Sequence, residues 1–303
     1  MPLWEDEYSG DVSFLRAGRT DNASGVDIAV LGIPYDLGTT GRPGARYGPR
    51  GVREQSLFVG DYEWGVWPWT YDIRSKHTVR DLGDVKGFNA YPDRLCPAVE
   101  KAAGSILKDG ASLFSIGGDH FVSLPLLRAH AAVHGPLALI HFDAHSDTWV
   151  NEDLTHGTMF YHAIKEGLID TSRSVQIGLR TPNPDDHGIL NLDAGICMKT
   201  PAMEIADRIR DRVGSNKAYL TFDIDFLDPA YAPATGTPVS GGPNVAYART
   251  ILQDLVGLNI VGGDQVEVAP HYEGAGQITA LAGATVSADI CYLIGEARTA
   301  LLK

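Results

Sequence analysis

Histidine and aspartate side chains gather in three short segments of this chain. The six candidate metal ligands are His120, Asp143, His145, Asp147, Asp223 and Asp225. Residues two apart on an extended chain point to one face, so the ligands within 143–147 and within 223–225 are expected to converge. Four crowded carboxylates repel one another and take up protons unless cations neutralise them. The pattern therefore predicts a pair of divalent metals and an enzyme.

The ligand types limit the metal and the chemistry. Carboxylate and imidazole without thiolate suit Mn²⁺, and Mg²⁺, Fe²⁺, Ni²⁺ and Zn²⁺ remain open on ligand type alone. Two metals that share a carboxylate and a water lower the pKa of that water and create hydroxide near neutral pH. Four aspartates, two divalent ions and one hydroxide sum to a charge of about −1. Such a site favours a cationic substrate.

Three neighbouring residues receive other assignments. His141 precedes the second segment and is expected to alternate out of the ligand face, as a structural histidine. Asp119 adjoins His120 and is expected to support the loop or the ligand rather than bind metal. A two-metal phosphoesterase would need cations for the phosphate, and Arg180 is the only obvious one, so that alternative is weak.

Apolar strands and amphipathic helices alternate along the chain. Expected strands are Asp27–Ile33, Ala111–Ile116, Leu137–Phe142, Ser174–Leu179, Ala218–Ile224 and Ile260–Val268. Expected helices are Asp93–Lys108, Val122–His134, Pro201–Val213, Asn244–Val256 and Gln277–Leu302. This alternation predicts a three-layer α/β/α fold with a mostly parallel, doubly wound sheet, in one domain over residues 1–303. Ligands bind beyond the carboxyl ends of such strands, where the candidate metal ligands fall.

Composition limits the classes of binding partner and the cellular compartment that we expect for this protein. The chain has 303 residues and a formal net charge of −13, which argues against a nucleic-acid surface. No apolar stretch looks long enough to cross a membrane, and Met1–Gly10 lacks the features of a secretory leader. Cys96, Cys197 and Cys291 follow no metal-binding spacing and are expected to be reduced thiols of a cytoplasmic protein.

Longer motifs resemble a known family. The chain reads GGDH at 117–120, FDAHSD at 142–147, LTHGTMF at 154–160 and FDIDFLDPAYAPATGTPVSGG at 222–242. These segments are similar to the ureohydrolase superfamily of arginases and agmatinases. The likeness runs from GIPYDLGTTGRPGARYGPRGVRE at 32–54 through EVAP at 267–270 to the final helix. The HGTMF block, the TFDIDFLDPAYAPATGTP block and ITAL at 278–281 most resemble bacterial agmatinases.

The resemblance implies an arginase-like fold with two Mn²⁺ per subunit. One ion would take His120, Asp143, Asp147 and Asp223, and the other Asp143, His145, Asp223 and Asp225. His156 matches the histidine that shuttles protons, and Glu267 matches the carboxylate that orients the guanidinium. The resemblance also implies a homotrimer or a homohexamer.

The implied reaction is hydrolysis of a guanidinium C–N bond. Hydroxide that bridges the metals would attack the guanidinium carbon, and collapse of the tetrahedral intermediate would release urea and a primary amine. With agmatine as the small cationic substrate, that amine is putrescine. Two alternatives stay open: another guanidino compound, such as 4-guanidinobutyrate, 3-guanidinopropionate or an alkylguanidine, and a non-catalytic regulatory relative.

Specificity depends on the far end of the substrate. The loop Thr148–Thr155 carries Glu152 and Asp153 and no basic residue, which favours a cationic tail, although both acids could equally face solvent. Asn151 could hydrogen-bond either kind of tail. Departures from the family pattern at Phe226 and at Gly263–Gln265 leave the candidate metal ligands unchanged and put the substrate in doubt.

Overall fold

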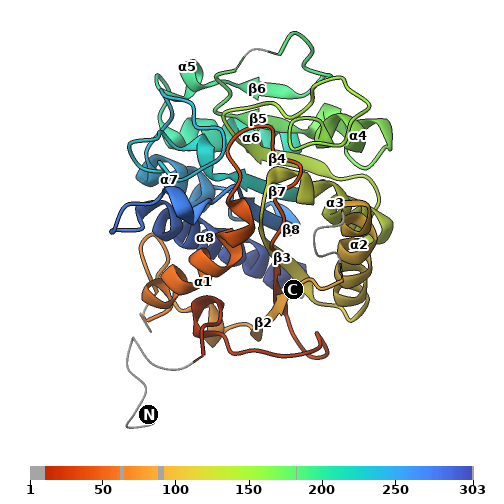
Figure 1. Cartoon of the computed structure of the whole chain (residues 1–303), viewed down its shortest axis with the longest axis vertical. Coiled ribbons are helices and arrows are strands. Elements are labelled where there is room, and N and C mark those ends of the chain that lie inside the picture. Colours follow the sequence, from red (N-terminus) through yellow and green to blue (C-terminus); the bar gives the residue numbers. More distant parts are fainter. Residues whose placement is uncertain (1–10, 62–64, 88–91, 182, 302–303) are drawn as a thin grey trace.

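One parallel sheet forms the centre of the protein (Figure 1). The computed structural model describes residues 11–61, 65–87, 92–181 and 183–301. The strands are β1 (Ile28–Ile33), β2 (Val79–Asp84), β3 (Ser112–Gly117), β4 (Ala138–Phe142), β5 (Val175–Ile177), β6 (Leu190–Leu192), β7 (Lys217–Asp223) and β8 (Asn259–Val266). Their order across the sheet is β2-β1-β3-β8-β7-β4-β5-β6, and every neighbouring pair is parallel.

Helices cover both faces of this sheet. They are α1 (Gly48–Val59), α2 (Pro92–Lys108), α3 (Ser123–His134), α4 (Met159–Lys165), α5 (Ala194–Cys197), α6 (Ala202–Val213), α7 (Val245–Asp254) and α8 (Ile278–Leu301). α2, α3 and α4 pack together on one face, and α1, α6, α7 and α8 pack on the other. The prediction of a three-layer α/β/α fold is confirmed.

The sheet has one hydrophobic core on each face. A strand can supply side chains to both cores, because successive residues point to opposite faces. In β1, Ile28 and Val30 belong to the core shared with α8, whereas Ala29 and Leu31 belong to the core shared with α2 and α3. All six residues of β1 are buried, as expected for a strand covered on both sides. The near-continuous apolar runs in the sequence therefore reflect two-sided burial.

The elements that sequence reasoning missed are those with weak signals. β2 and β6 lie at the two edges of the sheet; β2 contains exposed and half-buried positions, and β6 has only three residues. α1 begins with the poor helix-forming sequence Gly-Pro-Arg-Gly, and α4 and α5 are short. The predicted strands and longer helices are present with ends shifted by a few residues; Leu302 and Met1–Gly10 lie outside the described residues.

α8 corrects one expectation from the sequence. This helix of 24 residues is long and apolar enough to cross a membrane by composition alone. However, 83% of its apolar window is buried inside the protein, where it packs on β8, α1 and α7. Packing between the sheet and the neighbouring helices thus accounts for the hydrophobicity of α8.

His130 in α3 is expected to make stability fall in acid. Its ring is fully buried, Nδ1 lies 2.8 Å from the carbonyl oxygen of Leu126, and burial lowers its pKa to about 4. The unfolded chain, with a histidine pKa of about 6.5, binds this proton first, so stability is lost as pH falls from about 6.5 to about 4. The full loss is on the order of 3 kcal/mol.

Urea unfolding at neutral and acid pH tests this expectation. His130→Asn does not titrate, so the variant should lose less unfolding free energy on acidification than the wild type does. His271→Asn, at an exposed position, is the control and should follow the wild type. If wild type and His130→Asn lost equal amounts of unfolding free energy on acidification, His130 would not be the source of the acid sensitivity.

Candidate metal centre

Four neighbouring strands deliver the candidate residues to one edge of the sheet. β3, β8, β7 and β4 are adjacent, and the segments that carry His120, Glu267, Asp223 and Asp143 follow their carboxyl ends. Parallel strands place these ends together, which is the usual position of a ligand site in an open α/β sheet.

The turn after β3 depends on a glycine. A Cβ on Gly118 would lie 1.7 Å from the carbonyl oxygen of Tyr35, so only glycine fits there. Asp119 then caps the short helix that contains His120, and its Oδ2 accepts the backbone N–H of Gly38 at 2.7 Å. The prediction that Asp119 supports the loop is confirmed.

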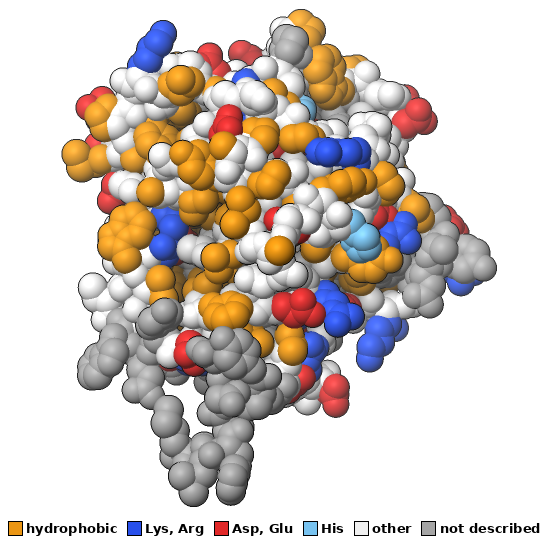
Figure 2. All heavy atoms as spheres, turned by 60° about the vertical axis from the view of Figure 1, so that its left-hand side comes forward, with side chains coloured by type: hydrophobic (Ala, Val, Ile, Leu, Met, Phe, Trp, Pro, Cys, Tyr) orange, Lys and Arg blue, Asp and Glu red, His pale blue; other side chains and the backbone are white. Residues whose placement is uncertain are grey.

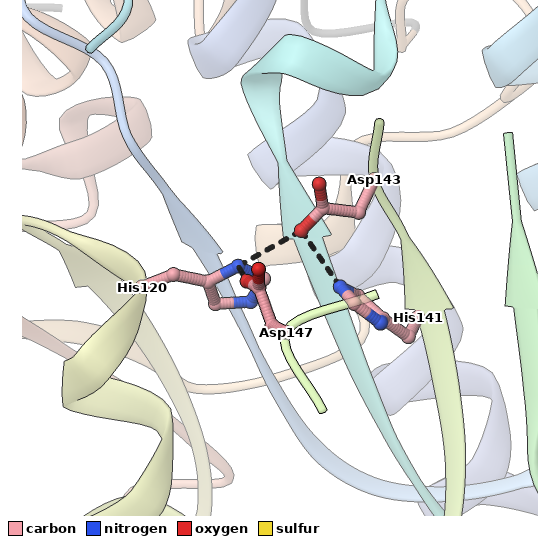
Figure 3. A group of neighbouring side chains, drawn as sticks. All are labelled: His120, His141, Asp143 and Asp147. Atoms are coloured by element: carbon pink, nitrogen blue, oxygen red, sulfur yellow. Dashed lines mark hydrogen bonds and ion pairs between the residues drawn. The ribbon is translucent and has the colours of Figure 1, made fainter. Parts of the chain in front are cut away.

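Figure 3 shows His120 facing a group of carboxylates. Its Nδ1 lies 3.0 Å from Asp143 Oδ2, 3.0 Å from Asp147 Oδ2 and 3.3 Å from Asp223 Oδ2. Both His120 and Asp143 are fully buried. A ring nitrogen surrounded by three carboxylate oxygens marks a point at which a cation would be coordinated.

His145 forms a second group beside the first. Its Nδ1 lies 3.1 Å from Asp225 Oδ2 and 3.3 Å from Asp143 Oδ1. Asp143 therefore contributes one oxygen to each histidine-centred group. The six predicted ligands come together, but Asp143, His145 and Asp147 divide between two groups instead of meeting at one point.

The hydrogen bonds of His120 leave Nδ1 free for a metal. Thr221 donates its hydroxyl proton to Asp264 Oδ1, so its oxygen accepts from His120 Nε2 at 2.8 Å. With the proton on Nε2, Nδ1 presents a lone pair toward the carboxylates. This buried Nδ1 has no hydrogen-bond partner among the described residues. The donor set and the free nitrogen both fit a divalent cation.

His141 corrects a prediction from the sequence. It was expected to face away from the cluster, yet its Nε2 lies 2.8 Å from Asp143 Oδ2 (Figure 3). Residues 141 and 143 are two apart, so alternation places them on the same face. Gln176 Nε2 donates to His141 Nδ1 at 3.1 Å, so Nε2 carries the proton and donates to Asp143. His141 thus orients a carboxylate that both groups share.

Without cations the carboxylates compete for protons. Burial, reinforced by the charges of Asp225 and Asp143, raises the pKa of Asp223 well above its usual range. Burial and the charge of Asp143 also raise the pKa of Asp225 to about 6. Two divalent cations would remove this repulsion, as the sequence predicted.

Metal affinity is expected to fall with falling pH. Metal ligands bind in their deprotonated forms, so a proton on Asp225 competes with the cation below about pH 6, and the raised pKa of Asp223 adds to this competition. We expect the apparent affinity for Mn²⁺ to drop about tenfold or more per pH unit there. Calorimetric titration with Mn²⁺ at neutral and acid pH measures this drop. An affinity that does not change with pH would contradict it.

His156 and Glu267 form a buried pair beside the candidate metal ligands. His156 Nδ1 donates to Glu267 Oε1 at 2.8 Å, and the backbone N–H of Thr40 donates to Nε2 at 2.9 Å. Burial alone would lower the pKa of His156, but the hydrogen bond and charge of Glu267 raise it to about 9. Both ring nitrogens thus have partners, and Nε2 takes up a proton only when it moves off the backbone N–H of Thr40.

Glu267 keeps one oxygen uncommitted. Oε1 also accepts the backbone N–H of His120 at 2.9 Å, whereas Oε2 is buried without a hydrogen-bond partner among the described residues. Leaving a buried carboxylate oxygen unpaired is costly, so this oxygen is suited to a ligand that donates N–H groups.

A cavity of about 280 Å³ opens above His156 and three of the candidate metal ligands, and the buried Glu267 lies behind its lining. It is lined by Thr40, His145, Asp147, Trp149, Thr155, His156, Gly157, Thr158, Asp223 and Thr237. Sequence reasoning did not identify Thr40, Trp149 or Thr237 as site residues. Trp149 lies in the loop Thr148–Thr155 that the sequence singled out, whereas no spacing rule connects Thr40 or Thr237 to the ligands. It is this cavity that gives a substrate access to the candidate metal ligands.

The three predicted substrate-binding residues of the loop Thr148–Thr155 lie outside the cavity lining, although Trp149 and Thr155 of the same loop line it. Asn151, Glu152 and Asp153 are exposed, and Glu152 pairs with Lys165 at 3.0 Å. Their assignment to substrate binding stays a prediction.

Other residues singled out in the sequence also lie outside the cavity lining. Arg180 donates to backbone carbonyl oxygens such as those of Asp225 and Val239, which commits it to holding loops and weakens the phosphoesterase alternative. Phe226 is buried and packs with Phe142 and Phe222, so this departure changes the core rather than the cavity.

Comparison with known proteins decides the family. The sequence model of the arginase family matches residues 26–292. The chain belongs to the arginase family. It is 48% identical over 274 residues to an agmatinase from Neisseria meningitidis, covering 90% of this chain and 88% of that protein. It is 44% identical over 301 residues to an agmatinase from Chromobacterium violaceum, covering 98% and 92%.

Comparison with solved structures supports the same family assignment. A hypothetical agmatinase from Burkholderia thailandensis superposes with a TM-score of 0.93 at 47% identity, covering 97% of this chain and 93% of that chain. The proclavaminate amidino hydrolase from Streptomyces clavuligerus gives a TM-score of 0.91 at 34% identity, covering 97% and 100%. Membership of this metal-dependent family makes the chain a hydrolase of the ureohydrolase class, and its buried histidine and aspartate cluster fits that class.

Proposed function

We propose that this enzyme is a binuclear manganese amidinohydrolase that converts agmatine and water to putrescine and urea. The observation that carries the proposal is the pair of histidine-centred groups that share Asp143. The agmatinase relatives at 44–48% identity support agmatine as the substrate.

Two cations would divide the six ligands. One would be held by His120, Asp143, Asp147 and Asp223, and the other by Asp143, His145, Asp223 and Asp225; the hard oxygen and imidazole donors favour Mn²⁺. When bound, the metals supply Lewis acidity and a water activated for attack near neutral pH.

The other side chains bind the substrate and move a proton. Glu267 Oε2, which lacks a partner among the described residues, accepts guanidinium N–H groups and orients the planar carbon. Water adds to that carbon, the bond from carbon to the alkylamine nitrogen breaks, and the amine leaves. His156, held by Glu267 through Nδ1, transfers a proton to the departing nitrogen from Nε2 once that nitrogen has moved off the backbone N–H of Thr40.

A second substrate class remains a candidate. The proclavaminate amidino hydrolase shares 34% identity with this chain and superposes almost throughout, so one scaffold accommodates different amidino compounds. A 4-guanidinobutyrate, 3-guanidinopropionate or alkylguanidine hydrolase would use the same candidate ligands, His156 and Glu267.

We also propose a cytoplasmic homotrimer or homohexamer built from a single ureohydrolase domain of residues 1–303. The continuous sheet supports one domain. Figure 2 shows hydrophobic side chains spread over the face that carries α5 and α7 in Figure 1. A groove of about 450 Å³ there is lined in part by Met198, Tyr231 and Tyr247. An apolar face of this kind supports contact between copies.

Urea release from the Mn²⁺-loaded protein tests the function. Agmatine, arginine, 4-guanidinobutyrate and 3-guanidinopropionate are compared side by side by kcat/KM. Preference for agmatine is expected. Preference for a guanidino acid would keep the chemistry and overturn the substrate. Absence of urea from all four with metal bound would overturn agmatine hydrolysis and leave an alkylguanidine hydrolase or a non-catalytic relative.

A further inference from the structure

The outer part of the cavity has an unusual composition for a site that must recognise a charged substrate tail. Its inner residues are the ligands His145, Asp147 and Asp223 together with His156. The rest of the lining consists of four threonines, Gly157 and Trp149. Hydroxyl groups and one indole thus surround the space beyond the guanidinium, and this part of the described lining carries no charged side chain.

The backbone around Trp149 holds its indole at this position. The backbone N–H of Trp149 donates to the carbonyl oxygen of Gly157 at 3.1 Å. The preceding Thr148 is buried, with its hydroxyl accepting from Asn183 at 3.0 Å and its carbonyl oxygen 3.1 Å from His187 Nε2. A Cβ on Gly157 would lie 3.7 Å from Trp149 Cδ1, so the indole packs over this glycine.

Trp149 is also open to a ligand. Its relative exposure is 41%, which is large for a tryptophan that lines a cavity. It follows the ligand Asp147 by only two residues, and the two side chains line the same cavity.

The chemistry of this wall distinguishes between substrate tails. A carboxylate would lose hydration without gaining a lysine or arginine among the described lining residues, which is unfavourable. An ammonium gains from the negative face of an indole, which is the best aromatic partner for a cation. Threonine hydroxyls can bond either group and therefore do not discriminate.

We propose that Trp149 is the specificity-determining residue of this site and that its indole binds the ammonium end of the substrate through a cation–π interaction. The inference rests on the proposed amidinohydrolase function and deepens it, because it assigns the class of substrate tail. It differs from the prediction that Glu152 and Asp153 bind the tail, since those side chains lie outside the cavity lining.

A pair of substrates isolates the charge of the tail. Agmatine and n-pentylguanidine have similar shapes, but the second ends in a methyl group where the first has an ammonium. Wild type, Trp149→Phe and Trp149→Leu are compared on both. Trp149→Leu should lower kcat/KM for agmatine about tenfold, mainly through KM, and change pentylguanidine by less than about twofold. Trp149→Phe, with a weaker π face, should fall between wild type and Trp149→Leu.

A matched control and a competing variant complete the design. Trp67→Leu makes the same change at an exposed tryptophan outside the cavity lining and should leave the ratio of the two substrates unchanged. The double variant Glu152→Gln/Asp153→Asn tests the acidic loop. A tenfold loss on agmatine there, with none in Trp149→Leu, would overturn the proposal, as would equal losses on both substrates in Trp149→Leu.

Binding is measured as well as turnover, so that failure of the Trp149 proposal can be distinguished from failure of the proposed function. Calorimetry of both guanidines with the Mn²⁺-loaded protein reports the tail contact even without hydrolysis. Tighter binding of agmatine that depends on Trp149, with no urea from any guanidine, would support this inference and overturn the proposed function. Urea release with a preference for guanidino acids would overturn this inference and the assignment of agmatine as substrate, while keeping the amidinohydrolase chemistry.

Discussion

Asp143→Asn is expected to abolish metal binding at both groups and to lower kcat/KM at least about 1000-fold, which corresponds to about 4 kcal/mol. Asp143 gives one oxygen to the group around His120 and the other to the group around His145. An amide carries no charge and offers only one acceptor oxygen, so neither group keeps its shared ligand. Metal content by mass spectrometry and steady-state urea release measure the two effects.

Asp186→Asn is the matched control for this substitution. Asp186 is exposed, and its carboxylate accepts the backbone N–H of Gly188, far from the candidate ligands in its contacts, so its variant should bind metal and turn over like the wild type. If Asp143→Asn retained two tightly bound Mn²⁺ ions, the assignment of Asp143 as the shared ligand would be wrong.

Glu267→Gln is expected to lower kcat/KM about 1000-fold while both metals stay bound. The substitution removes the negative charge that Oε2 offers to a guanidinium, but it keeps an oxygen that can accept from His120 N and His156 Nδ1. Comparing metal content with activity therefore distinguishes the role of Glu267 from that of the metal ligands.

The residual activity of Glu267→Gln should also lose its alkaline range. Glu267 raises the pKa of His156 to about 9, against the effect of burial. Without that charge the pKa falls, so the protonated ring needed by the leaving amine is lost at lower pH. Glu204→Gln, an exposed acid in α6, should leave the pH profile unchanged. Loss of metal from Glu267→Gln would contradict the view that Glu267 binds the guanidinium and does not hold the metals.

The sequence was sufficient to predict the arrangement of strands that builds this site. Continuous apolar runs marked β3, β4 and β7, and the polar segments after Gly117, Phe142 and Ile224 could be placed at one sheet edge because parallel strands share a direction. The edge strand β2 escaped prediction because its alternating burial left no such run.

Details that depend on local backbone strain could not be predicted. Asp147 and Glu267 both have left-handed φ angles, 52° and 66°, which non-glycine residues rarely adopt and which cluster at functional sites. The chain already bends at Ala144 and His145, directly after β4, and Asp147 reaches His120 while His145 reaches Asp225. Strand alternation alone could not divide the three ligands in this way.

The place of β8 in the sheet has a consequence for how the protein is made. β2-β1-β3 come from residues 28–117 and β7-β4-β5-β6 from residues 138–223, so the strands of both halves of the sheet are synthesised before β8. β8 is made last, yet it lies between β3 and β7 and is the strand that joins the halves. A ribosome-bound chain lacking it would hold His120 on one half and Asp143 on the other. Nascent chains are therefore expected to acquire metal only after this strand leaves the ribosome.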